Sequence, residues 1–150
     1  MIVKPAHDQS LGEVDAVVMS LFLGAKKSID FSTALTTGGL IRLRPAVETA
    51  LGRVAHFRLL LDSSVDAAAF RRDYAWLTAH PNMQVRQSSV PIPHWIGIDG
   101  RDFRLEEDHR DDPGHRSNVV ILDCETPLSQ EIRARFEAWW SVSVIVTSEK

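Results

Sequence analysis

The chain has 150 residues, of which 44% are apolar and 25% charged, and its formal net charge is -3. This length and composition predict one globular domain, residues 1–150, and exclude a disordered chain. A small net negative charge also argues against a generally basic nucleic-acid binder, so any site for a polyanion must be local.

The first elements are a lead-in segment and a helix. Residues 1–7 are expected to be a lead-in that can add a strand to a sheet. Ser10 begins an S-x-x-E capping box, and the apolar residues after it repeat at helical intervals, which predicts a helix from about residue 10 to 26. Lys26 and Lys27 are then expected in its last turn, where cations suit the helix dipole.

Strands and helices alternate in the next sixty residues. Residues 54–61 form a nearly continuous apolar run, which is typical of a central strand covered on both faces. Pro45 predicts that the helix around it restarts there or follows a short turn, because proline breaks a helix interior. The predicted elements are a strand at 28–34, a helix at 40–51, the strand at 54–61, a helix capped by Ser63 or Ser64 and ending at His80, and a strand at 83–86.

The second half begins with a hairpin. Asp99 and Gly100 separate two alternating stretches, Trp95–Ile98 and Phe103–Leu105, which is a strong signal for two antiparallel strands. The elements that follow are a polar loop at 107–117, a strand at 119–122, a helix that starts at Thr126 and Pro127, and a short strand within 142–146. The whole order predicts a layered α/β domain.

Several segments together resemble one half of a phospholipase D-like fold, of the single-copy type found in some restriction nucleases and helicase-linked proteins. The matching segments are GAKKSID, TALTTGGL, VAHFRLLLD, LTAHPNMQVR, IDG, NVVI and RFEAWW, in this order. The resemblance covers roughly residues 10–140. It implies an α/β/α layered domain with a mixed sheet of about seven strands.

The activity of that family depends on the motif HxK(x)4D. Its histidine attacks phosphorus, its lysine neutralises phosphate oxygens, and a histidine from a second copy protonates the leaving group. If Asp99 is the motif aspartate, His94 stands at the lysine position and Ile92 at the histidine position. If His94 is instead the nucleophile, Ile96 stands at the lysine position. Both registers lose essential chemistry, so the motif is degenerate.

The polar residues around this motif are the candidate site. His94 and His109 are candidate catalytic residues, as an acid and base pair, if the loop after the hairpin folds back over the sheet. Arg104 and Glu106 share one face of a strand, so Arg104 is a candidate anion contact that Glu106 orients. Asp99 is a further candidate ligand contact, although a turn-forming role before Gly100 is the plainer interpretation.

The polar loop at 107–117 is rich in acidic residues, and we call it the acidic loop. Metal binding by this loop is the weaker alternative, because the spacing of its acidic and histidine residues matches neither a pair of ligands on a helix nor a calcium-binding loop. We therefore expect no metal and no cofactor. No apolar run approaches the roughly 18 residues of a membrane span, and the start lacks the apolar core of a signal peptide, so a cytoplasmic protein is expected. Cys124 is the only cysteine, so no disulfide forms within the chain.

Two functions from different classes follow. The first is a catalytically degenerate phospholipase D-like domain that binds a phosphate-containing ligand or a protein partner, as part of a DNA-processing or regulatory system. The second is an active phosphodiesterase or nuclease that uses His94 and His109 in a non-standard site. A homodimer is expected in either case, because single-copy members of the phospholipase D-like family, which the chain resembles, build their site across a twofold axis.

Overall fold

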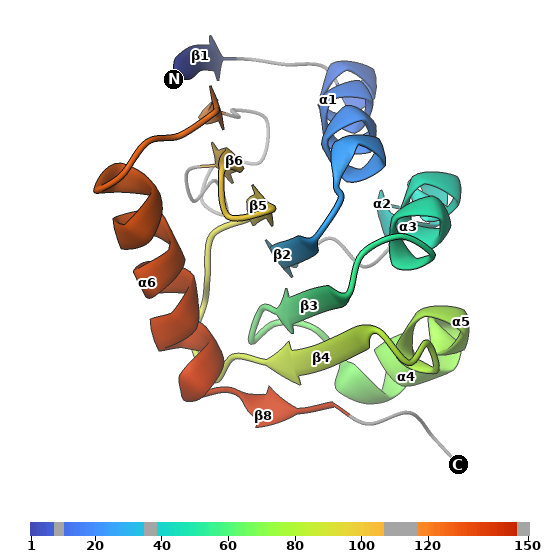
Figure 1. Ribbon diagram of the computed structural model, residues 1–150. Coiled ribbons are helices and arrows are strands. Elements are labelled where there is room, and N and C mark those ends of the chain that lie inside the picture. Colours follow the sequence, from blue (N-terminus) through green and yellow to red (C-terminus); the bar gives the residue numbers. More distant parts are fainter. Residues whose placement is uncertain (8–10, 35–38, 107–116, 147–150) are drawn as a thin grey trace.

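The computed structural model describes residues 1–7, 11–34, 39–106 and 117–146. Their strands form one sheet in the order β1-β7-β6-β5-β2-β3-β4-β8, with helices on both faces (Figure 1). The elements are β1 (Ile2–His7), α1 (Leu11–Gly24), β2 (Ser28–Thr33), α2 (Gly39–Arg42), α3 (Arg44–Leu51), β3 (His56–Leu61), α4 (Ala67–Asp73), α5 (Ala75–Thr78), β4 (Met83–Gln87), β5 (Trp95–Ile98), β6 (Asp102–Glu106), β7 (Ser117–Leu122), α6 (Leu128–Ser141) and β8 (Val144–Ile145). The predicted layered α/β/α architecture is confirmed, with eight strands instead of about seven.

The centre of the sheet is parallel and its flanks are antiparallel. β2, β3 and β4 run parallel to one another, because helices connect them in turn. β5 and β6 form the predicted hairpin, with φ of 56° at Asp99 and 69° at Gly100, as a tight hairpin turn requires. β5 pairs antiparallel with β2, and β1 pairs antiparallel with β7 at one edge. The segment 1–7 is therefore an added strand.

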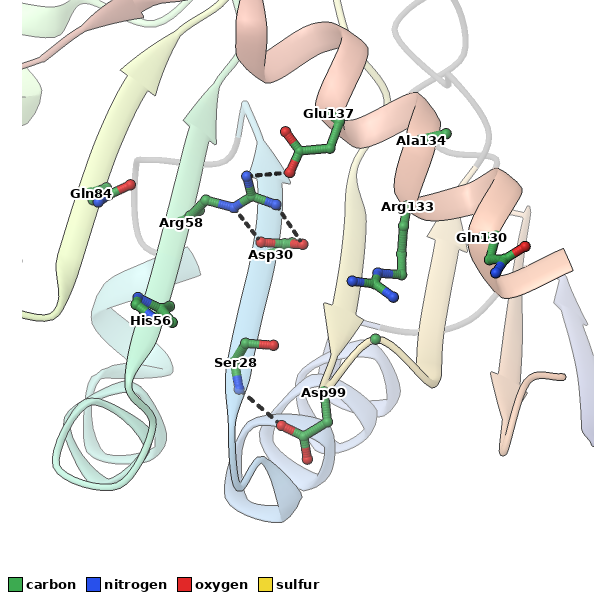
Figure 2. A pocket seen from close by; sticks show the side chains of 11 residues that line it. Ser28, Asp30, His56, Arg58, Gln84, Asp99, Gln130, Arg133, Ala134 and Glu137 are labelled. Atoms are coloured by element: carbon green, nitrogen blue, oxygen red, sulfur yellow. Dashed lines mark hydrogen bonds and ion pairs between the residues drawn. The ribbon is translucent and has the colours of Figure 1, made fainter. Parts of the chain in front are cut away.

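Helix α6 covers one face of the sheet alone (Figure 1). Ile132, Phe136 and Trp140 are its buried apolar residues, whereas Leu128, the first residue of the helix, is 38% exposed. A polar contact adds to this packing: Arg58 on β3 binds Asp30 on β2 and Glu137 on α6 (Figure 2).

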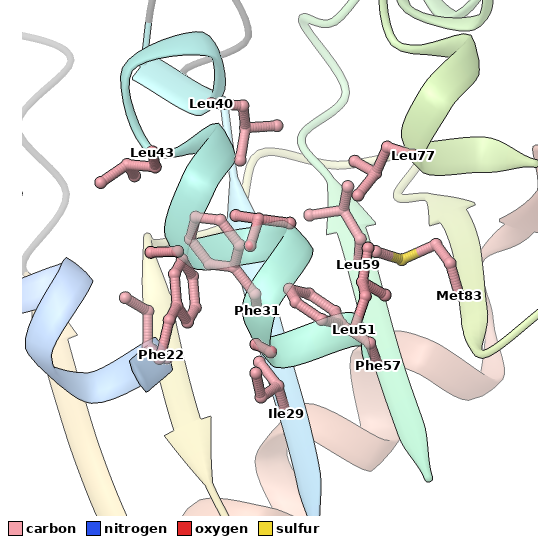
Figure 3. Packing of buried hydrophobic residues seen from close by; sticks show 14 of the residues in the cluster. Phe22, Ile29, Phe31, Leu40, Leu43, Leu51, Phe57, Leu59, Leu77 and Met83 are labelled. Atoms are coloured by element: carbon pink, nitrogen blue, oxygen red, sulfur yellow. The ribbon is translucent and has the colours of Figure 1, made fainter. Parts of the chain in front are cut away.

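The larger core lies on the opposite face, beneath α1 to α5 (Figures 1 and 3). Its sheet residues alternate with polar ones along each strand, so Phe31 on β2 and Phe57 on β3 point toward the helices. Phe22 of α1 packs against both rings, with centroid distances of 5.5 and 5.9 Å. Each fully buried side chain of this size contributes about 1.5–3 kcal/mol, which makes this cluster the main source of stability.

Two helix boundaries differ from the prediction. Helix α1 ends at Gly24, so Lys26 and Lys27 lie after it and not in its last turn. Helix α4 is capped by Asp66, whose carboxylate accepts hydrogen bonds from the backbone N–H groups of Ala68 and Ala69. Neither Ser63 nor Ser64 is the cap; the Ser64 hydroxyl donates to Asp62 instead. The helix restart at Pro45 is confirmed, with α3 starting at Arg44.

Replacing Asp66 with alanine is expected to lower the free energy of unfolding by about 1 kcal/mol, because two N–H groups of the first turn of α4 lose their acceptor. Ser63→Ala is the matched control and should change it by less than about 0.5 kcal/mol. Urea denaturation of both variants measures the difference. Equal losses in the two variants would show that Asp66 does not cap the helix.

In the part of the chain that the structure describes, no helix is both long and apolar enough to cross a bilayer.

Candidate functional site

Buried polar side chains gather at one edge of the sheet, where β2 and β3 end. Among the described residues, the other buried side chains are apolar except Ser129 on α6, so this edge stands out. Its buried polar members are Ser32, Thr33, Asp62, Ser88, Arg104, Glu106 and Asn118. Buried polar groups are costly unless paired, and the carboxyl ends of parallel strands are where α/β sheets place their ligands. We call this group, together with His94, the Arg104 cluster.

Two members of the cluster fix the chain segment before β5. One carboxylate oxygen of Asp62 accepts a hydrogen bond from the backbone N–H of Ile92, at 2.7 Å. The Ser32 hydroxyl donates to the carbonyl of Pro93 at 2.7 Å and accepts from the N–H of Trp95 at 3.0 Å. These three bonds hold the segment against the ends of β2 and β3. The backbone on either side of His94 is therefore held in place.

His94 lies next to the predicted anion-binding pair. Its Nε2 accepts a hydrogen bond from the backbone N–H of Ala34, at 3.2 Å, so the lone pair of that nitrogen is already engaged. Its Nδ1 lies 3.9 Å from a carboxylate oxygen of Glu106. The same oxygen accepts a hydrogen bond of 3.0 Å from Nη1 of Arg104. Arg104 and Glu106 thus share one face of β6, as the alternation along this strand predicted, and His94 lies beside them.

Arg104 presents an unpaired edge inside the protein. The residue is 2% exposed, and in the register of β5 and β6 it stands opposite Ile96, on the face of the main core. Nη1 binds Glu106, but Nε and Nη2, which form the side edge of the guanidinium, have no hydrogen-bond partner among the described residues. Each buried unpaired donor costs about 1–3 kcal/mol. Two parallel N–H groups in this arrangement match two oxygens of a phosphate or carboxylate.

Asp99 lies at the other edge of the sheet, away from the Arg104 cluster (Figure 2). Its carboxylate accepts hydrogen bonds from the backbone N–H groups of Lys26, Lys27 and Ser28, which lead into β2. Burial raises the pKa of Asp99, but these three bonds and the charge of Lys27 outweigh burial and hold the pKa below its ordinary 3.8. In this structure Asp99 joins the β5–β6 turn to the start of β2.

The motif positions that the sequence singled out differ in environment. Ile92 is 1% exposed and packs in an apolar cluster with Leu60 of β3 and with Phe136 and Trp140 of α6. It therefore points toward α6, whereas Arg104 lies on the opposite face. His109 and the acidic loop lie outside the described residues. Within the described ranges, no group of three or more histidine, cysteine, aspartate or glutamate residues could hold a metal ion.

The sequence did not single out Ser32 and Asn118. A signal existed for Ser32, because it lies near the end of a buried strand parallel to the one that precedes Asp62, and such ends meet at one edge. Asn118 stands opposite Glu106 in the register of β6 and β7. Its place next to Glu106 depends on that register, which no local pattern of the sequence specifies.

No protein-family model matches the chain, and no curated protein matches it. Several solved structures are similar to it. TrmBL2, an archaeal chromatin protein with a novel mode of DNA binding, is 11% identical with a TM-score of 0.74, over 96% of this chain and 54% of that chain. Nuc from Salmonella typhimurium, a phospholipase D family member, is 16% identical with a TM-score of 0.71, over 98% of this chain and 99% of Nuc. NucT from Helicobacter pylori is 11% identical with a TM-score of 0.67, over 96% of this chain and 99% of NucT.

These similarities establish the fold of the chain. Nuc and NucT are matched along nearly their whole length, so the sheet and its helices correspond as one unit. The chain spans about half the length of TrmBL2. The fold is therefore phospholipase D-like, as the sequence predicted, and function must be argued from the side chains of the Arg104 cluster.

Proposed function

We propose that this chain is a catalytically inactive phospholipase D-like domain that binds a phosphate group of a nucleic acid or of another phosphate-containing ligand. The observation that carries the proposal is the buried side edge of Arg104, whose Nε and Nη2 have no hydrogen-bond partner among the described residues. Arginine is suited to this task because its charge persists inside a protein and its planar edge takes two phosphate oxygens at once.

The surroundings of His94 support the loss of catalysis. A histidine nucleophile or base needs the lone pair of a ring nitrogen. Nε2 of His94 uses that lone pair to accept the N–H of Ala34. The other motif position is held by Ile92, a side chain that cannot attack phosphorus. Positive charge remains at the site in Arg104, and this favours binding without turnover.

The similar structures support nucleic acid as the first ligand to test. TrmBL2 is a chromatin protein that binds DNA, and Nuc belongs to the phospholipase D family. The net charge of this chain is -3, so binding would depend on a local contact and not on a broad basic surface. A homodimer, a cytoplasmic location and a role in DNA processing or regulation are further parts of the proposal.

The first experiment tests catalysis. The wild-type protein is expected to hydrolyse neither bis-p-nitrophenyl phosphate nor single-stranded DNA, with or without divalent metal ions, because the motif lacks its nucleophile. The variants His94→Ala and His109→Ala are measured beside it. Hydrolysis by the wild type that either substitution abolishes would contradict the proposal, and would support the alternative of an active phosphodiesterase that uses these two histidines.

The second experiment tests binding of a fluorescently labelled single-stranded oligonucleotide. In Arg104→Lys the side chain keeps a charge to pair with Glu106 but loses the two-nitrogen edge, so the dissociation constant is expected to rise at least about tenfold. Arg72→Lys is the control, because Arg72 is exposed on α4 and pairs with Asp73, which is not a member of the cluster. It should change the dissociation constant less than about twofold. Equal affinity of Arg104→Lys and wild type would refute a phosphate contact by Arg104.

A further inference from the structure

A hollow lies between α6 and the first residues of β2, β3 and β4, at the opposite ends of these strands from the Arg104 cluster (Figure 2). Its volume is about 550 Å³, which is within the roughly 300–1,000 Å³ typical of small-molecule sites. The sheet residues that line it are polar, because they alternate with the apolar residues of the main core. We call this hollow the Arg133 groove.

The carboxylates of the groove already have partners. Asp30 accepts two hydrogen bonds from Arg58, at 2.8 and 3.0 Å, and Glu137 accepts a third from the same guanidinium at 2.6 Å. Asp99 accepts its bonds from the backbone that precedes β2. Arg58 is in turn held over the rings of Phe136 and Trp140. Each of these carboxylates therefore has hydrogen-bond donors other than Arg133, although Asp30 and Glu137 share the single positive charge of Arg58.

Arg133 is the cation that remains. Its side chain extends from α6 into the groove (Figure 2), and no hydrogen bond or ion pair joins it to a residue in the described ranges. Gly100 leaves room for it, because a Cβ at Gly100 would lie 3.4 Å from Cζ and Nε of Arg133. The guanidinium therefore lies over the β5–β6 turn with its donors available to a ligand.

Hydroxyl, imidazole and amide side chains also line the groove around this cation. Ser28 and His56 line the groove from the first residues of β2 and β3, Gln84 lines it from β4, and Gln130 lines it from α6 one turn before Arg133. Hydroxyl, imidazole and amide groups both donate and accept hydrogen bonds. They suit a ligand whose body carries hydroxyl groups, whereas an apolar ligand would leave them unpaired.

We infer that the Arg133 groove binds a small polar metabolite with a single oxyanion group, a phosphate or a carboxylate, on a hydroxylated body. The oxyanion pairs with the guanidinium of Arg133, and the hydroxyl groups bond to the amides of Gln84 and Gln130. This site is separate from the Arg104 cluster, because it lies where β2 and β3 begin, whereas the cluster lies where they end, and Arg104 itself lies on the opposite face of the sheet. It does not depend on the proposed phosphate contact of Arg104.

The test is an NMR titration of the full chain, which follows the Nε–H of Arg133 and the side-chain amides of Gln84 and Gln130. Ribose 5-phosphate and gluconate are the probes, since they separate phosphate from carboxylate as the recognised group, and ribose is the uncharged control. At least one of the two anions is expected to shift these signals saturably, whereas ribose at the same concentration should not. The same titration of Arg104→Lys should be unchanged.

Substitutions test the role of the guanidinium. Arg133→Gln is expected to raise the dissociation constant of the bound anion at least about tenfold. Arg135→Gln is the matched control, because Arg135 is exposed on the same helix and does not line the groove, and it should have less than about a twofold effect. The inference is overturned if neither anion shifts the groove signals at about 10 mM, or if Arg133→Gln binds as tightly as the wild type.

Discussion

Replacing Arg104 with methionine is expected to lower the free energy of unfolding by about 3 kcal/mol, because the substitution removes the guanidinium that pairs with the buried carboxylate of Glu106. Both side chains are 3% exposed, so water cannot replace the lost bond without local opening of the structure. Urea denaturation monitored by tryptophan fluorescence measures the change.

A double substitution separates the ion pair from packing. Glu106→Leu together with Arg104→Met replaces both charges with apolar groups of similar size, and such replacements of buried pairs are often neutral. The double variant is expected to recover at least half of the loss. If the double variant is less stable than Arg104→Met alone, the cost of the single substitution does not come from the loss of the ion pair between Arg104 and Glu106.

The second large effect is expected at Asp99, where substitution by glycine should lower the free energy of unfolding by about 2 kcal/mol. Three backbone N–H groups before and at the start of β2 lose their acceptor, and hydrogen bonds to a charged group are stronger than neutral ones. Glycine is chosen because φ at Asp99 is 56°, a region in which alanine would add strain of its own. Asparagine tolerates this φ and keeps one acceptor oxygen, so Asp99→Asn is expected to lower the free energy of unfolding by only about 1 kcal/mol.

The contribution of Asp99 should also depend on pH. Its pKa is lower in the folded protein than its ordinary 3.8, so its contribution is complete above that value and is lost as pH falls through the folded pKa. The difference in unfolding free energy between wild type and Asp99→Gly should thus be constant above about pH 5 and shrink below pH 3.8. A difference that grows on acidification would contradict the hydrogen bonds to the carboxylate.

Most of the fold could be predicted because local patterns agree with the global arrangement. The apolar run at 54–61 predicts a central strand, and Asp99 with Gly100 predicts a hairpin, as the sheet confirms. The end of α1 could not be predicted. The N–H groups of Lys26 and Lys27 bind Asp99, more than seventy residues away in the sequence, and no helical pattern records that contact.

Part of the candidate site also followed from periodicity. Arg104 and Glu106 are two residues apart on one strand, so they had to share a face. Asp99 was grouped with them because it is close in sequence, yet β5 has four residues and spans about 13 Å, which places His94 and Asp99 at opposite edges of the sheet. The unpaired edge of Arg104 required side-chain positions, since a sequence shows a charge but not its partners.

The most direct test of the account is an NMR titration of the Nε–H of Arg104 with dimethyl phosphate, a phosphate diester without a base or sugar. The account predicts a saturable shift of this signal in the wild-type protein, together with shifts at the backbone of His94 and Glu106, and no hydrolysis of the diester. The account is contradicted if the Arg104 signal stays unchanged while the diester shifts signals elsewhere, or if the diester is cleaved.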